Sequence, residues 1–163
     1  MFILKKLNEI SFDIASLGKI GKWNGGGILA SSFAFPIILI GNILFDFSPA
    51  FFYWSLAVLA GISLLIIFLA VNFVAADRYP SDIVLDKVWG MIVTFAFVPL
   101  KWKLMIFGFV AFHIINFLRP FLFNKSLGER LEHLPFGVGI WAGDLVSGFF
   151  CNIFLQLIIW VGN

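Results

Sequence analysis

Long uncharged stretches separated by short polar segments dominate the pattern of the chain. The stretches 28–45, 47–76 and 145–162 contain no Asp, Glu, Lys or Arg. A helix needs about 20 residues to cross the hydrocarbon core of a bilayer, so each stretch predicts a membrane-spanning helix. Two shorter stretches, 88–100 and 104–118, lie on either side of the triplet Lys101-Trp102-Lys103.

The two shorter stretches allow two interpretations. They predict either a pair of spanning helices whose ends extend into charged flanks, or a re-entrant hairpin buried among other helices. In both cases we expect an all-α fold, a polytopic membrane bundle with four or five spans. The expected spans lie near residues 28–45, 51–74, 86–100, 103–118 and 145–162.

The N-terminal segment, residues 1–23, has no continuous apolar core and no small-residue cleavage site, so it does not predict a removed signal peptide. Its apolar residues recur at helical spacing with charged residues between them, which favours an amphipathic helix in the membrane interface. A partly ordered tail is the alternative. The apolar set is Ile3, Leu4, Leu7, Ile10 and Ile14. With no repeat or linker, residues 1–163 are expected to form a single membrane domain.

The distribution of Lys and Arg predicts the topology. With five spans and a cytosolic N-terminus, only Lys101 and Lys103 lie outside, which obeys the positive-inside rule. The polar segments 77–87 and 119–144 then share the cytosolic face. We expect a multi-pass protein of the bacterial inner membrane whose active face is cytosolic.

Composition removes several classes of function. Of the 163 residues, 61% are hydrophobic and 12% are charged, and the mean hydropathy is +1.04, which excludes a water-soluble globule. The net charge of +2 is scattered, so we expect no nucleic acid partner. The single cysteine, Cys151, excludes a disulfide framework. The sequence leaves the oligomeric state open.

Carboxylates in the first polar segment are the first candidates for chemistry. Asp82 and Asp86 are four residues apart, so a helix that begins near Pro80 would place both on one face, where they could hold a divalent cation. The alternative is a pair of solvated carboxylates favoured by the helix dipole.

Two further groups lie beside the second polar segment. His113 and Asn116 are three residues apart on an apolar stretch closed by Arg119, and they could contact a substrate or form a hydrogen bond between helices. Asp144 follows the glycines of Gly137-Val138-Gly139-Ile140-Trp141-Ala142-Gly143. It could be a metal ligand or a helix cap, with Gly148 present for close helix packing.

Four blocks in order resemble the bacterial phosphatidylglycerophosphatase A family. The family shows Gly-Thr-x-Gly-Ser before a proline, Asp-Glu-x-x-Gly-Met, Phe-Arg-x-x-Asp-x-x-Lys-Pro and Gly-x-Gly-x-x-x-Asp-Asp-x-x-Ala-Gly. In this chain the first block is eroded to Gly27, Ile28, Ala30 and Ser31 before Pro36. The others correspond to Asp86–Met91, Phe112–Pro120 and Gly137–Gly148.

The resemblance implies Mg²⁺-dependent removal of the terminal phosphate of phosphatidylglycerophosphate, an anionic phospholipid, to give phosphatidylglycerol. The chain departs from the family at four positions, with Lys87, His113, Asn116 and Gly143 where the family has Glu, Arg, Asp and Asp. Three carboxylates are lost and a cation is added. Only Asp86 and Asp144 remain in register as catalytic and metal-ligating carboxylates.

The leading hypothesis is therefore a membrane-embedded lipid phosphatase. Asp82 is the expected replacement metal ligand, while Arg119 and Lys87 recognise the phosphate, with His113 and Asn116 as further substrate-binding candidates. A catalytically impaired or inactive family member that binds lipid or protein is the alternative. A small transporter is a third class, disfavoured because 47–76 holds no ionisable residue.

Overall fold

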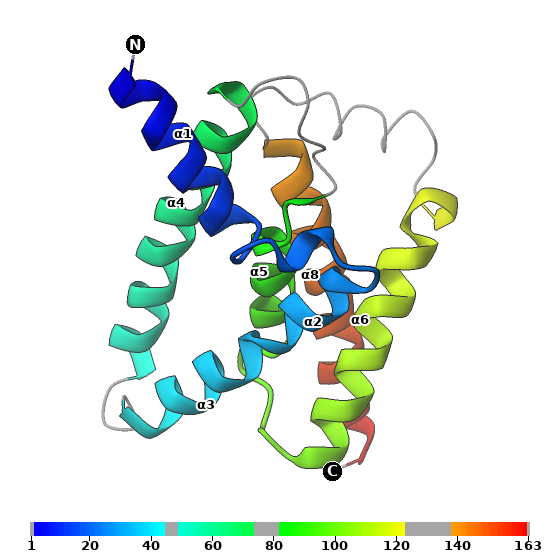
Figure 1. Ribbon diagram of the computed structural model, residues 1–163. Helices are drawn as coiled ribbons and strands as arrows, with labels where there is room; N and C mark the ends of the chain where they lie inside the picture. The colour runs from blue at the N-terminus through cyan, green and yellow to red at the C-terminus, as the bar shows by residue number, and fades with distance from the viewer. Residues whose placement is uncertain (1, 45–48, 74–81, 123–137, 163) are drawn as a thin grey trace.

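A computed structural model describes residues 2–44, 49–73, 82–122 and 138–162, and these residues form helices and connections with no strand. The predicted all-α fold is confirmed (Figure 1). The elements are α1 (Phe2–Ala15), the short 3-10 helix η1 (Ile20–Lys22), α2 (Gly26–Ser32), α3 (Ala34–Leu44), α4 (Pro49–Phe73), α5 (Leu85–Thr94), α6 (Trp102–Leu122) and α8 (Val138–Gly162).

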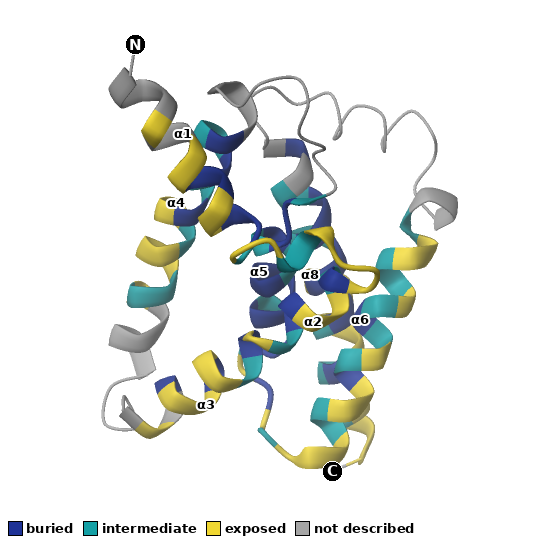
Figure 2. Cartoon of the chain, viewed as in Figure 1, coloured by how far each residue is buried: buried dark blue, intermediate teal, exposed yellow. Residues whose placement is uncertain are grey.

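Two of these helices are long and apolar enough to cross a membrane. They are α6, over Trp102–Arg119, and α8, over Trp141–Gly162. Only 11% of the first segment and 22% of the second is buried inside the protein, so most of their residues are partly or fully exposed (Figure 2). Exposed apolar surface of this extent indicates association with a membrane. The number of four or five spans is not confirmed.

Residues 28–44 of the uncharged stretch 28–45 belong to two helices that meet at Phe33. Helix α2 ends at Ser32, the N–H of Phe33 donates to Ala30 O, and α3 begins at Ala34. Helix α4 covers the stretch expected near 51–74.

The N-terminal segment is helical over α1, which packs on α4. Phe12 and Ala15 are buried together with Ile67 and Ala70 of α4, whereas Ile10 and Ile14 are exposed.

Helix α5 is the most enclosed helix among the described residues and packs mainly against α8 and α2 (Figure 2). Its apolar side chains Val88, Met91 and Ile92 are buried in the main core, together with Phe112 of α6 and Leu155 of α8. The backbones of α5 and α8 touch at Gly90 and Gly148, because a Cβ on Gly148 would enter the Gly90 carbonyl. Glycines at both positions therefore permit this close crossing.

The segment expected to span near 86–100 is only partly helical. Helix α5 has ten residues and rises about 15 Å, which is half of a bilayer core. The chain then turns at Phe95–Phe97, where Phe97 has a φ of 58°, and runs without regular structure to Lys101 beside the start of α6. The prediction of a helical span over 86–100 is thus wrong in its second half.

Side chains of α8 satisfy the backbone of this non-helical stretch. Asn152 Nδ2 donates to Thr94 O at 3.0 Å and to Ala96 O at 2.7 Å, and Gln156 Nε2 donates to Phe97 O at 3.2 Å. Free carbonyl groups are strongly disfavoured away from water, so these amides make the break in the helix possible.

Candidate functional site

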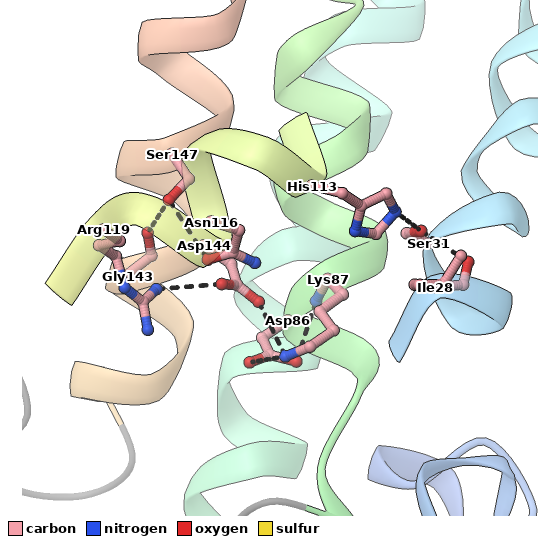
Figure 3. A network of polar contacts seen from close by, with 10 residues as sticks. All are labelled: Ile28, Ser31, Asp86, Lys87, His113, Asn116, Arg119, Gly143, Asp144 and Ser147. Atoms are coloured by element: carbon pink, nitrogen blue, oxygen red, sulfur yellow. Dashed lines mark hydrogen bonds and ion pairs between the residues drawn. The ribbon is translucent and has the colours of Figure 1, made fainter. Parts of the chain in front are cut away.

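The beginning of α5, the end of α6 and the beginning of α8 meet at a group of four ionisable side chains, here called the ionic cluster: Asp86, Lys87, Arg119 and Asp144 (Figure 3). The Gly90–Gly148 crossing lies one helical turn further along α5 and α8, so it brings Asp86 and Asp144 close together. The end of the polar segment 77–87 and both ends of the polar segment 119–144 thus meet at one end of the bundle.

Asp144 holds both cations of the ionic cluster. Lys87 Nζ donates to Asp144 Oδ2 at 3.2 Å, and Arg119 Nη1 donates to Asp144 Oδ1 at 3.0 Å. Lys87 Nζ also lies 3.6 Å from Asp86 Oδ2, an ion pair longer than a hydrogen bond.

Exposure differs between the two kinds of charge. The carboxylate side chains are 2% and 3% exposed, whereas the side chains of Lys87 and Arg119 are 28% and 30% exposed. The two carboxylates therefore lie at the buried side of the cluster, and the two cations lie at its accessible side.

Burial sets the protonation of the cluster. Burial, reinforced by the negative charge of Asp144, raises the pKa of Asp86 to about 7, although Lys87 opposes this shift. Burial lowers the pKa of Lys87, but the charges of Asp86 and Asp144 outweigh it and the net shift is upward. Near neutral pH Lys87 is a cation, and Asp86 can hold or release a proton.

Two glycines make room for the two cations. A Cβ on Gly143 would run into the guanidinium of Arg119, and a Cβ on Gly27 of α2 would lie 2.7 Å from Cδ of Lys87. Gly143 is one of the positions where the chain departs from the resemblance described above. Gly27 belongs to the eroded first block, whose contribution to the site the sequence alone does not reveal.

His113 and Asn116 connect helices and form no ion pair or hydrogen bond with the ionic cluster among the described residues. Ser31 Oγ of α2 donates to Ile28 O at 2.8 Å and therefore accepts from His113 Nε2, 3.0 Å away. Asn116 Oδ1 lies 3.4 Å from Ser147 Oγ of α8. These contacts support the interhelical alternative, and their role in substrate binding stays a prediction.

Asp82 does not share a helix face with Asp86. Helix α5 begins at Leu85, and the N–H of Val84 donates to Ala15 O of α1 at 3.0 Å, so the residues between the two carboxylates are held out of the helix. The prediction of a helix that starts near Pro80 and carries both carboxylates is wrong at Ile83 and Val84; Pro80 itself lies outside the described residues.

The residues present do not fit Mg²⁺. Within the described ranges no three side chains of His, Cys, Asp or Glu gather closely enough to hold a metal ion. Mg²⁺ requires oxygen ligands about 2.0–2.1 Å away in octahedral geometry. Both carboxylates that could serve already pair with a cation, and Gly143 offers no ligand atom.

An apolar cavity of about 270 Å³ is lined by residues of α3, α4, α5, α8 and the stretch that follows α5, and by none of the four residues of the ionic cluster. Two tryptophans contribute to its lining, Trp89 three residues after Asp86 on α5 and Trp141 three residues before Asp144 on α8. Their Nε1 atoms are buried and have no hydrogen-bond partner among the described residues. The lining of the cavity is therefore suited to an apolar group.

One comparison with known proteins gives a match. The model of a protein family described as Phosphatidylglycerophosphatase A matches residues 14–159. No curated protein matches the chain, and no solved structure matches it.

Proposed function

Because the chain belongs to the phosphatidylglycerophosphatase A family, we propose that it is a lipid phosphatase that converts phosphatidylglycerophosphate to phosphatidylglycerol and phosphate. The observation that carries this proposal is the ionic cluster. Two cations, each about one-third exposed, are fixed by one buried carboxylate at the end of two apolar helices. Such a pair suits a phosphomonoester presented at a membrane surface.

Lys87 and Arg119 bind the phosphate in this proposal. Arg119 offers a planar set of N–H donors that can take two phosphate oxygens, and Lys87 adds a compact charge. Since Asp144 orients both side chains, the cations are in position before the substrate arrives, and little ordering is needed during the reaction.

The apolar cavity between α3, α4, α5 and α8 supports a lipid as the substrate class, because its walls suit an acyl chain.

The hydrolysis transfers the phosphoryl group to water. A water oxygen forms a bond to phosphorus, the bond from phosphorus to the glycerol oxygen breaks, and its electron pair leaves on that oxygen. Asp86, with a pKa near neutral, gives its proton to the leaving oxygen and regains one from the attacking water. The products are the lipid alcohol and hydrogen phosphate, and the cations stabilise the charge that develops.

The proposed location is the bacterial inner membrane, in a multi-pass arrangement with the ionic cluster at the cytosolic face. The excess of Lys and Arg in the polar segments supports this orientation. It also agrees with the position of the cluster at one end of α6 and α8.

Phosphate release by the purified protein in detergent tests the function. We expect release from phosphatidylglycerophosphate and, because the cavity favours a lipid, at least about tenfold slower release from glycerol 3-phosphate. Asp144→Asn is the inactive reference, and Lys101→Ala, an exposed cation at the other end of α6, is the matched control. No release from either substrate would contradict the proposal and leave a non-catalytic lipid-binding protein.

A further inference from the structure

We propose that the ammonium group of Lys87 takes the place of a divalent cation between Asp86 and Asp144, so that the ionic cluster works without a metal ion. The catalytic half of this inference rests on the proposed lipid phosphatase function, whereas the exclusion of a metal ion does not. The geometry that carries it is the position of Lys87 Nζ, 3.6 Å from Asp86 and 3.2 Å from Asp144.

The charge of the cluster is already balanced. When Asp86 is ionised, two carboxylates face two fixed cations, Lys87 and Arg119. A divalent ion placed between the carboxylates would meet both cations within a few ångströms, where like charges repel strongly in a buried setting. It would also have to displace the hydrogen bonds that Asp144 accepts on both of its oxygens.

The space around the cluster is shaped for the two cations. The stem of Lys87 passes over Gly27, where a Cβ would come within 2.7 Å of Cδ and 2.8 Å of Cε. The guanidinium of Arg119 fills the volume next to Gly143 in which any side chain at that position would begin. Lys87 beside the two acids and Gly143 beside Arg119 therefore both favour cations at this position.

A metal ion between Asp86 and Asp144 could serve two roles. A bound cation can polarise the phosphate and can also hold two carboxylates close together against their repulsion. Lys87 does both, because its ammonium group lies near both acids and its side chain is 28% exposed. Arg119 adds a second positive charge on the far oxygen of Asp144.

Manganese titration of the purified full-length protein in detergent, followed by electron paramagnetic resonance, tests the exclusion of a metal ion. We expect no Mn²⁺ binding by the unmodified protein up to about 1 mM, an affinity weaker than about −4 kcal/mol. Lys87→Ala, which leaves two acids and one cation, should bind Mn²⁺. Gly143→Asp, which adds a carboxylate and displaces the flexible end of Arg119, is the second variant for the case that Lys87→Ala fails to fold.

Phosphate release measured in EDTA and in Mg²⁺ is the second readout. The unmodified protein should change by less than about twofold between the two, since no step draws on a metal ion. Lys87→Ala should lose about tenfold or more and regain part of it with ethylammonium or Mg²⁺. Lys101→Ala is the control for nonspecific effects of lost charge.

Several results would overturn the inference. They are Mn²⁺ binding by the unmodified protein that disappears in Asp144→Asn, loss of turnover in EDTA that Mg²⁺ restores, and absence of Mn²⁺ binding by the folded variants Lys87→Ala and Gly143→Asp. If the unmodified protein releases no phosphate in any buffer, the proposed function fails. The inference then stands or falls on the Mn²⁺ titration alone.

Discussion

The two ends of α6 carry positive charge in opposite ways. At the C-terminal end, Arg119 is fixed by a buried carboxylate that also binds Lys87. At the N-terminal end, Lys101 and Lys103 are exposed and form no ion pair among the described residues, and Lys103 lies over the ring of Trp102 with its Nζ 5.6 Å from the ring centroid. One end therefore holds its cations rigidly, and the other leaves them in solvent.

The contrast between the two ends indicates which cations are held in a geometry suited to binding. Lysines beside a tryptophan suit a membrane interface, and they need no acidic partner for that role. Burying Asp86 and Asp144 is unfavourable unless cations pair with them. Such buried ion pairs occur, among the described residues, at the C-terminal end of α6 and not at its N-terminal end. Fixed geometry at this end is what recognition of a phosphate requires.

Asp144→Asn should have the largest effect on turnover. It removes the charge that orients Lys87 and Arg119, so both cations become as loosely held as Lys101 and Lys103 at the other end of α6. We expect phosphate release to fall about 100-fold or more. Turnover and thermal unfolding of the variant decide this, with Asp13→Asn, an exposed acid of α1, as the control. Full activity in Asp144→Asn would remove Asp144 from the site.

Arg119→Ala and Lys101→Ala compare the two ends directly. A charge-assisted hydrogen bond to phosphate contributes about 1.5–3 kcal/mol, so Arg119→Ala should lower kcat/KM by about 10–100-fold. Lys101→Ala should stay within about twofold of the unmodified protein, because solvent screens an exposed charge. Equal and small effects of both variants would identify Arg119 as a topology anchor only.

Gly148→Ala tests the crossing that brings the acids together. Its Cβ would enter the backbone of α5 at Gly90, which cannot move aside as a flexible side chain would. We expect a loss of about 1–3 kcal/mol in unfolding free energy and a smaller loss of turnover than Arg119→Ala produces. Gly61→Ala in α4, where a Cβ meets nothing within 4 Å, is the matched control. Similar stability of the two variants would show that α5 and α8 can separate without consequence.

His113→Ala should have the smallest effect. His113 donates to Ser31 across α6 and α2 and does not pair with the ionic cluster, so the variant should lose about 1 kcal/mol of unfolding free energy. Turnover should remain within about threefold, and Ser31→Ala should behave alike because both variants remove the same bond. A loss of turnover as deep as that of Arg119→Ala would place His113 in contact with substrate.

The sequence predicts the helices whose signal lies within their own residues. Uncharged stretches indicate α4, α6 and α8, and the order of the motif blocks indicates Asp86, Asp144 and Arg119. The break after Ser32 and the end of α5 at Thr94 give no comparable signal. Asn152 and Gln156 satisfy the carbonyls after α5 from a helix far along the chain, which periodicity cannot show.

The contacts of Lys87 could not be predicted for a similar reason. The sequence identifies it as a departure from the family but gives no position for Nζ, which depends on Gly27 in α2 and on Asp144 in α8. Local spacing predicts that Asp82 lies on the same helix as Asp86, and the tertiary structure differs. The hydrogen bond from the N–H of Val84 to Ala15 O holds that part of the chain against the end of α1, and it does not extend α5.

The hydrogen bonds donated by the side-chain amides of Asn152 and Gln156 also imply an order of events during synthesis of the chain. The carbonyls of Thr94, Ala96 and Phe97 are translated 56 to 59 residues before the side chains that bind them. Until α8 has been synthesised, this stretch lacks its partners, and its carbonyl groups are better placed in water than in lipid. Assembly of the ionic cluster likewise waits for α8, because Asp144 is the residue that holds Lys87 and Arg119.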